Sequence, residues 1–428
     1  MRLWLLCLLP LPVMLLDAQG TAPQPPVSKP GVTGLPWWLK AGVELRGRAE
    51  ASTGIDHRPG VDDGYYLHRI RLNATVEPHR WVRFVLQVQD AQAPAFSRKP
   101  VPSAFANTLD LRQGYVELGL AEKGRWGLRF GRQELILGEE RLVGAANWGN
   151  VGRTFDAARL TYRAPGVRLD WFASAVVPVV NGRFDQPRLR NGFYGFYSAF
   201  DRLPRNTVVE PYFLWKTTAV LAGDLDIYTA GARLLGKLSR GFDYNVEMAF
   251  QGGHSARDRH RAWAGHWLLG YTAPLKDRPP RFLIEYNYAS GDGNPRDGRR
   301  GTFDQLYPTN HNKYGTADRI GWRNIHDFMP GVEWKPARQW TLKLDVHTFW
   351  LASRQDAFYT EAGAVFLRNP DAASNRVGSE IDLQAIAQLS ERLQLGLGYG
   401  RLFAGPYLRV SGRPGAFGYP YLMWTYRF

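Results

Sequence analysis

Cysteine, long apolar runs and acidic residues are all scarce in this sequence. Its 428 residues include one cysteine, Cys7, so disulfides and thiol chemistry are excluded from the rest of the chain. After position 16 no run of about 20 apolar residues occurs, which excludes transmembrane helices there. Acidic residues number 39 against 54 basic ones, and the formal net charge is +15. What remains to be explained is a basic, thiol-free chain of ordinary hydrophobic content.

The first 36 residues have the composition of a targeting segment rather than of a folded core. Arg2 precedes an apolar stretch that extends to Leu16, and small residues follow it. This pattern predicts a signal peptide over 1–20, cleaved after Gly20. Residues 21–36 contain five prolines and show no apolar period, so we expect a proline-rich linker there.

The basic excess consists mainly of arginine, which accounts for 44 of the 54 basic side chains. In an exported protein this excess disfavours nucleic acid as a partner and favours an anionic surface or an anionic solute. A GC-rich genome would also enrich arginine, so composition alone does not separate these two explanations.

Beyond position 37, apolar side chains occupy nearly every second position. In WWLKAGVELRGRAE (37–50) the odd positions from 43 onward are apolar or small, while the even ones are charged. The segments YYLHRIRLNATVE (65–77), GFDYNVEMAFQ (241–251) and RFLIEYNYAS (281–290) repeat this pattern. Such alternation is typical of β-strands whose two faces meet different environments.

Alternation alone would also fit a β-sandwich with one wet face, and three further features favour a membrane barrel. The segments are about 10–14 residues long, as tilted membrane-spanning strands require. Tight turns such as EPHR (77–80) and LSER (389–392) alternate with longer polar connections. Tryptophans gather toward segment ends, where an interfacial girdle would place them; they are Trp37, Trp38, Trp81, Trp126, Trp340 and Trp424.

We therefore predict an all-β fold, a closed antiparallel transmembrane β-barrel of about 18 strands with short periplasmic turns and long extracellular loops. In this interpretation residues 37–428 form one barrel. The least regular segments are 192–218 and 323–335. Long connections are expected near 51–63, 92–108, 178–191, 253–260, 291–322, 353–375 and 405–417.

The face opposite the apolar one would line a lumen, and it is rich in arginine. On the early segments it carries Arg46, Arg48, Arg69, Arg71 and Arg83, with Arg129 on the fifth. Later segments add Lys343 and acids such as Glu380 and Asp382, so the charges could pair across the lumen and simply maintain its shape. Against that alternative, the first four arginines lie on adjacent strands, where like charges repel unless an anion neutralises them.

A row of guanidinium groups suits a solute that bears repeated carboxylates, because each group can bind one carboxylate through two hydrogen bonds. One deep site would trap such a solute, whereas a series of similar sites lets it pass from one to the next. The pattern therefore predicts conduction rather than catalysis.

Two long stretches carry specific motifs. They are LRFGRQELILGEERLVGAANWGNVGRTFDAARL (128–160) and IEYNYASGDGNPRDGRRGTFDQLYPTNHNKYGTADRIGWRNIHDF (284–328). Both resemble the alginate export family of outer-membrane proteins, and shorter similarities at 223–251, 344–352 and 377–385 extend the resemblance over most of the chain. It implies a monomeric barrel of about eighteen strands in the outer membrane of a Gram-negative bacterium. It also implies an arginine-rich constriction through which a linear polyuronate leaves the cell.

The resemblance also suggests particular pore residues. Arg129 and Arg132 belong to the matching LRFGRQEL motif and are expected in or near the constriction. Arg141 and Arg153 follow in the same stretch and would line the pore if it folds inward. An anionic polysaccharide is then the expected solute. A general anion-selective porin, or a sugar or oligosaccharide uptake channel, remains the alternative because a fold does not fix its cargo.

Other groups of residues give weaker signals. Glu380 and Asp382 match an acidic pair of the family. Asp292, Asn294 and Asp297 have calcium-like spacing but lack the closing glutamate. His254, His260 and His266 fit no zinc pattern, and no serine lies in a strained nucleophile turn. We expect no enzymatic activity, no cofactor and no metal site.

The final segment, YLMWTYRF (421–428), places Leu422, Trp424, Tyr426 and Phe428 on one face. It resembles the C-terminal assembly signal of outer-membrane barrels, so outer-membrane lipid and the barrel assembly machinery are expected partners. A secretion pathway would add periplasmic partner proteins. The sequence leaves open the direction of transport and whether a loop near 92–108 or 291–322 plugs the pore.

Overall fold

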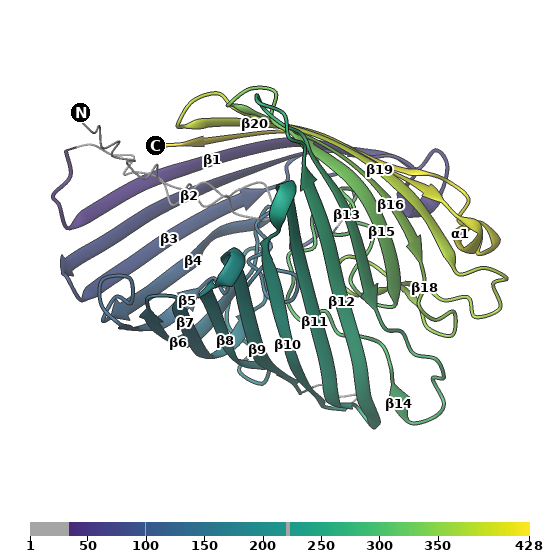
Figure 1. Cartoon of the computed structure of the whole chain (residues 1–428), viewed down its shortest axis with the longest axis horizontal. Helices are drawn as coiled ribbons and strands as arrows, with labels where there is room; N and C mark the ends of the chain where they lie inside the picture. Colours follow the sequence, from purple (N-terminus) through teal and green to yellow (C-terminus); the bar gives the residue numbers. More distant parts are fainter. Residues whose placement is uncertain (1–33, 99, 220–222) are drawn as a thin grey trace, which may run out of the picture.

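The computed structural model describes residues 34–98, 100–219 and 223–428. The predicted signal peptide, Cys7 and most of the proline-rich linker lie outside these residues. Eighteen antiparallel strands form a closed barrel (Figure 1), which confirms the predicted fold class. No helix among the described residues is long and apolar enough to cross a membrane.

The barrel strands follow one another around the wall in chain order. They are β1 (Leu39–Ser52), β2 (Asp63–His79), β3 (Val82–Gln92), β4 (Asn107–Leu118), β5 (Trp126–Gln133), β6 (Thr154–Ala164), β7 (Val167–Val177), β8 (Gly192–Leu203), β9 (Thr207–Thr218), β10 (Leu225–Lys237), β11 (Phe242–Ser255), β12 (Asp258–Thr272), β13 (Arg281–Ala289), β15 (Ile325–Trp334), β16 (Trp340–Trp350), β19 (Arg376–Gln388), β20 (Leu393–Ala404) and β21 (Phe417–Arg427).

Shorter elements lie in the connections. They are the 3-10 turns η1 (Ile55–His57), η2 (Pro204–Asn206) and η3 (Ser239–Gly241), the strand β14 (Arg299–Arg300) beside β12, the paired strands β17 (Phe358–Tyr359) and β18 (Val365–Leu367), and the helix α1 (Pro406–Val410).

The barrel closes where β21 pairs with β1. Glu44 lies opposite Arg427, and the backbone amide of Phe428 donates to the Val43 carbonyl at 3.0 Å. Closure satisfies the hydrogen-bonding groups of both edge strands, which hydrocarbon could not do. The C-terminal segment 421–428, with its apolar face, therefore belongs to the strand that completes the barrel.

The predicted alternation of short and long connections is observed, with two exceptions, at 253–260 and at 134–153. The two least regular segments form β8, β9 and β15, which agrees with the predicted strand number. The prediction of a long connection at 253–260 is wrong, because Ser255 pairs directly with Asp258 across a two-residue turn. Polar residues there resemble a loop in composition, but β11 and β12 remain paired up to this turn as a two-stranded ribbon. Gly253 permits this ribbon with a φ of +126°, a conformation that L side chains rarely adopt.

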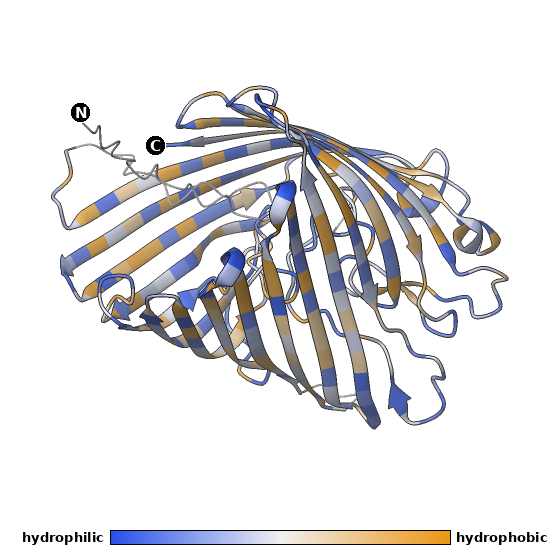
Figure 2. Ribbon diagram, viewed as in Figure 1, coloured by the Kyte–Doolittle hydropathy of each residue, from blue (hydrophilic) through white to orange (hydrophobic). Residues whose placement is uncertain are grey.

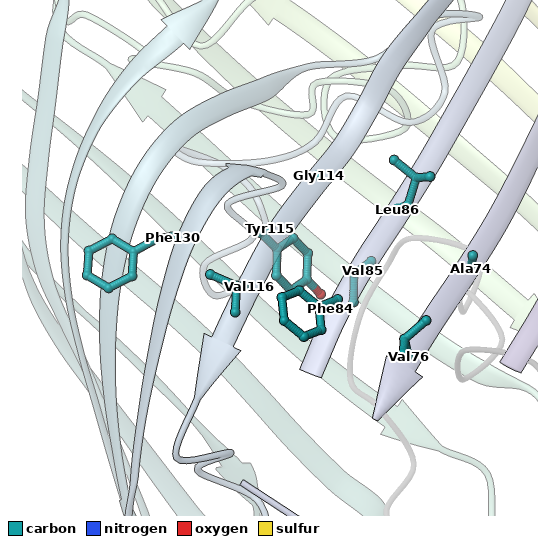
Figure 3. A pocket seen from close by; sticks show the side chains of 9 residues that line it. All are labelled: Ala74, Val76, Phe84, Val85, Leu86, Gly114, Tyr115, Val116 and Phe130. Atoms are coloured by element: carbon teal, nitrogen blue, oxygen red, sulfur yellow. The ribbon is translucent and has the colours of Figure 1, made fainter. Parts of the chain in front are cut away.

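Hydrophobic and hydrophilic residues alternate along the strands of the wall (Figure 2), as predicted. On β2, Ile70 and Leu72 are 41% and 51% exposed, whereas the intervening Arg69 and Arg71 are 4% and 7% exposed. The outer surface also contains a shallow groove across β2 to β5, to which Phe84 and Leu86 contribute (Figure 3). Because this groove is apolar and lies on the lipid face, it is not a candidate site for a polar solute.

The interior of the barrel is filled by connections from the long-loop side. The β5–β6 connection (134–153) and the β13–β15 connection (290–324) bind each other through an isolated bridge between Val143 and Tyr307. Leu142 and Phe303 contribute to one buried apolar cluster with strand residues. The 291–322 loop was expected to be long, but the 134–153 connection was not among the predicted long loops.

Candidate functional site in the lumen

Four of the predicted arginines form a compact group on the inner face of β1 and β2. Arg46 lies opposite Arg69 in the strand register, and Arg71 lies opposite Glu44. All four arginines, including Arg48, are 2–7% exposed. Strand alternation places them on one face because residues two apart point to the same side.

Only part of this positive charge is neutralised by carboxylates. Glu50 pairs with Arg48 at 2.5 Å, and Glu44 pairs with Arg69 at 2.6 Å. Arg46 and Arg71 have no carboxylate oxygen within 4 Å among the described residues, although Arg71 donates to the Gln89 side chain at 2.7 Å. Two guanidinium groups in this face are therefore bound by neutral groups alone.

Apart from Gln89 on β3, the neutral partners belong to one inward-folded segment, 145–151. Arg46 donates to the carbonyls of Asn147 at 2.8 Å and Gly149 at 3.0 Å. Arg48 donates to the carbonyl of Trp148, and Arg71 to the side-chain oxygen of Asn147 at 3.0 Å. Neutral oxygens of this one segment thus occupy hydrogen-bonding positions along the arginine row.

Trp148 fixes this segment over the arginine row. The Arg48 guanidinium lies 4.2 Å from the centre of the indole, and His311 stacks on the indole with centroids 3.6 Å apart and planes within 2°. Tyr421 of β21 makes an edge contact with the indole at 4.9 Å. Cation–π and stacking contacts of this kind each contribute about 0.5–2 kcal/mol.

A fifth arginine of the group, Arg112 on β4, was missed by the sequence analysis. It is 5% exposed, pairs with Glu134 at 2.7 Å and donates to the Ala145 carbonyl at 3.3 Å. The pairing of β3 and β4 shifts register after Gln87, which marks a bulge. A bulge breaks the period of two, so counting alternate positions does not find Arg112.

Arg129 and Arg132 lie on β5, further around the barrel, and both are paired. Arg129 bonds to Glu117 at 2.9 Å, and its guanidinium lies 4.3 Å from the ring of Tyr115. Arg132 binds both oxygens of Asp156, at 2.8 and 3.2 Å. Neither contacts the 145–151 segment, so the motif arginines and the arginine row are separate groups.

Arg83 and Lys343 lie near the short-turn end of the barrel. Arg83 contacts Glu77 at 2.9 Å and Glu122 at 2.5 Å. Lys343 contacts Glu333 at 3.6 Å. These basic residues line a mouth whose wall charges are balanced.

Arg141 is placed inside the barrel, but within a dense ion-pair network. It contacts Glu139 at 3.0 Å and Glu285 at 2.9 Å, and Arg233 of β10 approaches Glu139 at 3.7 Å. Burial alone would raise the pKa of Glu139, but Lys313, Arg141 and Arg233 hold it below its ordinary value. Burial would likewise lower the pKa of Arg141, and the two carboxylates raise it instead. This network ties the interior connections to β10 and β13.

Arg153 belongs to a second basic group around the ring of Tyr307. Its guanidinium lies 5.7 Å from the ring centre and the ammonium of Lys216 lies 5.2 Å from it. Lys216 pairs with Asp304 at 2.9 Å, whereas Arg153 donates to the Pro308 carbonyl at 2.8 Å. Burial lowers the pKa of Arg153 to about 10. Burial would raise the pKa of Asp304, but Lys216 and Arg323 keep it below its ordinary value.

Glu380 and Asp382 on β19 hold an interior connection. Glu380 accepts the backbone amide of Ala317 at 2.8 Å, and Asp382 accepts that of Thr316 at 3.0 Å. His347 lies between Asp382, at 3.6 Å, and Asp327, at 2.9 Å. The structure thus gives this acidic pair a positioning contact with the 290–324 connection.

Among the described residues no group of three or more His, Cys, Asp or Glu side chains could hold a metal ion. His260 bonds to Gln251 at 3.1 Å, and His266 bonds to Asn287 at 2.9 Å. Asp292 receives the backbone amide of Asn294 at 3.1 Å, as in an ordinary turn.

The barrel resembles solved outer-membrane proteins in fold. The outer membrane protein OpdK of Pseudomonas aeruginosa superposes with a TM-score of 0.60 at 13% identity, over 91% of this chain and 99% of that one. OccK8 (OprE) of the same species gives 0.61 at 12% identity, over 91% and 98%. A BenF-like porin of Pseudomonas fluorescens Pf-5 gives 0.60 at 9% identity, over 91% and 98%. At these identities the similarity establishes the fold.

Comparison by sequence identifies the family. A search of curated proteins finds no match to this chain. The profile of the alginate export family matches residues 37–414, which include nearly the whole barrel. Together with the closed barrel, this match places the protein in the Gram-negative outer membrane as a channel. The chain belongs to the alginate export family.

Proposed function

We propose that this channel conducts an anionic polysaccharide of the polyuronate type across the outer membrane, with the arginine row on β1, β2 and β4 as its binding face. The observation that carries the proposal is the unbalanced charge of this face. Arg46, Arg48, Arg69, Arg71 and Arg112 converge there, while Glu44, Glu50 and Glu134 are their carboxylate partners within 4 Å. The surplus guanidinium groups are bound only by neutral oxygens.

Carboxylates of a passing chain would replace these neutral oxygens. Hydrogen bonds between a guanidinium and a carboxylate are roughly twice as strong as neutral ones, so the exchange favours the solute. Because several arginines lie side by side, one carboxylate can be released as the next is bound. Movement along the row would thus require no single deep binding step, but it would require the 145–151 segment to leave the row.

Arg46 and Arg71 provide the sharpest test. Within the described part of the chain neither has a carboxylate within 4 Å, so replacing both with glutamine removes positive charge without breaking an ion pair. In planar bilayers we expect the double variant to lose anion selectivity, and block by oligogalacturonate to weaken at least tenfold, as loss of charged hydrogen bonds worth about 1.5–3 kcal/mol each requires. Arg188→Gln, on the exposed 178–191 loop, is the matched control. Unchanged selectivity and block in the double variant would refute the assignment of the row.

A channel for small carboxylates is the second candidate, and a fold relative supports it. One solved structure of OpdK contains vanillate and shares the fold with a TM-score of 0.57 at 13% identity. If small carboxylates are the natural solutes, benzoate-like anions should permeate readily and oligogalacturonate should neither block the current nor alter its selectivity. The same recordings therefore separate the two candidates.

A further inference from the structure

The short turns at the periplasmic end carry a concentrated positive charge that is separate from the arginine row in the lumen. The eight turns between barrel strands on this side contain ten basic and three acidic residues. The connections on the opposite side contain nineteen basic and fourteen acidic residues over a much greater length. The excess of basic over acidic residues is therefore larger on the short turns than on connections several times longer.

Six arginines, from six different turns, represent this feature, which we call the basic rim. They are Arg80, Arg125, Arg205, Arg240, Arg338 and Arg392. All six are exposed, and within the described residues none has a carboxylate within 4 Å. Inside the mouth, by contrast, Arg83, Arg281 and Lys343 are each paired with acids. The basic residues of the inner wall near the mouth are thus paired with acids, whereas those of the basic rim are not.

Backbone conformation gives an independent sign that the rim charge is specific. Arg205 and Arg240 adopt φ angles of 59° and 60°, in the left-handed region. Glycine or asparagine adopts that conformation at least cost, and an ordinary L side chain costs about 1–2 kcal/mol there. Turn geometry alone therefore does not favour arginine at these two positions.

We propose that the basic rim is a docking surface that captures an anionic polymer arriving from the periplasm and delivers it to the arginine row. This rests on the proposed function and adds a first binding station and a side of entry. A ring of unpaired cations around a mouth raises the local concentration of a polyanion and its rate of association by about 10–10³-fold, an effect that salt screens. The balanced wall behind the rim neither repels nor traps the polymer.

Acidic phospholipid is the other anion near these turns, since Arg80 and Arg125 each adjoin a tryptophan of the girdle. A lipid contact would serve residues on the outer circumference. The rim instead surrounds the whole mouth, so a polymer entering at any point passes several of its arginines. We therefore assign the rim to the polymer, and the test uses membranes that distinguish the two.

Single channels in phosphatidylcholine bilayers, with oligogalacturonate added to one side at a time, test this proposal. We expect faster association from the periplasmic side, and a steep loss of that advantage between 50 and 500 mM salt, about tenfold or more. Replacing Arg80, Arg205, Arg240 and Arg392 with glutamine should slow periplasmic association about tenfold and leave the dissociation rate unchanged. The control replaces four exposed basic residues on the opposite side, Arg58, Arg188, Arg190 and Arg257.

The outcomes separate this proposal from the proposed function. Block that is equally fast from both sides, or insensitive to the rim variant, overturns the rim as a docking surface while leaving the arginine row as the binding face. An effect of the rim variant that appears only in bilayers containing phosphatidylglycerol assigns these arginines to lipid and also overturns it. Absence of block from either side overturns both the rim proposal and the proposed function. If the variant assembles poorly, the salt dependence of association measured on the wild-type protein still tests the rim.

Discussion

Replacing Trp148 with alanine should release the 145–151 segment from the arginine row. The indole contacts the Arg48 guanidinium on β1, the ring of His311 and the ring of Tyr421 on β21. The cation–π contact contributes about 0.5–2 kcal/mol and each aromatic contact about 0.5–1.5 kcal/mol. Because the hydrogen bonds from Arg46 remain, we expect a net loss of about 2–3 kcal/mol, which increases the undocked population about 30- to 150-fold.

Two measurements follow that population. Hydrogen exchange of the amides in 145–151 should accelerate by the same factor, since exchange requires the segment to open. Single-channel recordings should show longer open times and tighter block by oligogalacturonate, because the polymer no longer competes with the carbonyl oxygens. Trp148→Phe keeps an aromatic ring and should show a smaller change in both. Trp171→Ala, on the lipid face, is the control for loss of a tryptophan.

Either of two results would refute this reasoning. If Trp148→Ala assembles normally and exchange of 145–151 is unchanged, the aromatic contacts do not hold the segment. If exchange accelerates but conduction and block are unchanged, the segment is not what limits access to the row.

Three further predictions concern other parts of the molecule. Burial raises the pKa of Asp185 to about 6 from 3.8, so docking of the 178–191 loop should be strongest below pH 4 and should weaken as the pH rises through 6. Hydrogen exchange of this loop, measured as a function of pH, tests this expectation. The Asp185→Asn variant should show no such pH dependence. Gly253→Ala would place a Cβ 2.0 Å from a carbonyl oxygen of β10 and should lower the temperature at which the barrel loses its heat-modifiable gel mobility by several degrees, whereas Gly252→Ala, with open space around it, should not. Glu380→Ala removes the acceptor of the Ala317 amide and should increase proteolysis of the 290–324 connection; unchanged cleavage would contradict a holding role.

Sequence patterns predicted the wall of the barrel well because the direction of each strand side chain depends on its position relative to its sequence neighbours. Alternation of apolar and polar residues reflects lipid on one side and lumen on the other, so the strands and the inward direction of Arg46 and Arg69 can be read from consecutive positions. Arg112 was missed because a bulge interrupts that period. The 253–260 segment was misjudged because its polar composition resembles that of a loop, although its residues pair across the ribbon of β11 and β12.

The interior could not be predicted because its contacts join residues far apart in the chain. Arg46 and Asn147 are separated by 101 positions, and Arg141 and Glu285 by 144. The segment AANWGN (145–150) offers small residues and one large ring, which is compatible with close packing, but nothing in it indicates that its carbonyls face arginines. The partners of the predicted row are thus known only from the fold, and its role as a pore lining stays a prediction.

The closing contact between β21 and β1 has a consequence for how the protein is made. The 145–151 segment is bonded to Arg46 on the first strand, and its Trp148 contacts Tyr421 on the last. Because β21 is synthesised last, it can pair with β1 only after all the other strands have been made. The segment therefore bridges the two strands that must meet, and its sequence bears on biogenesis as much as on transport.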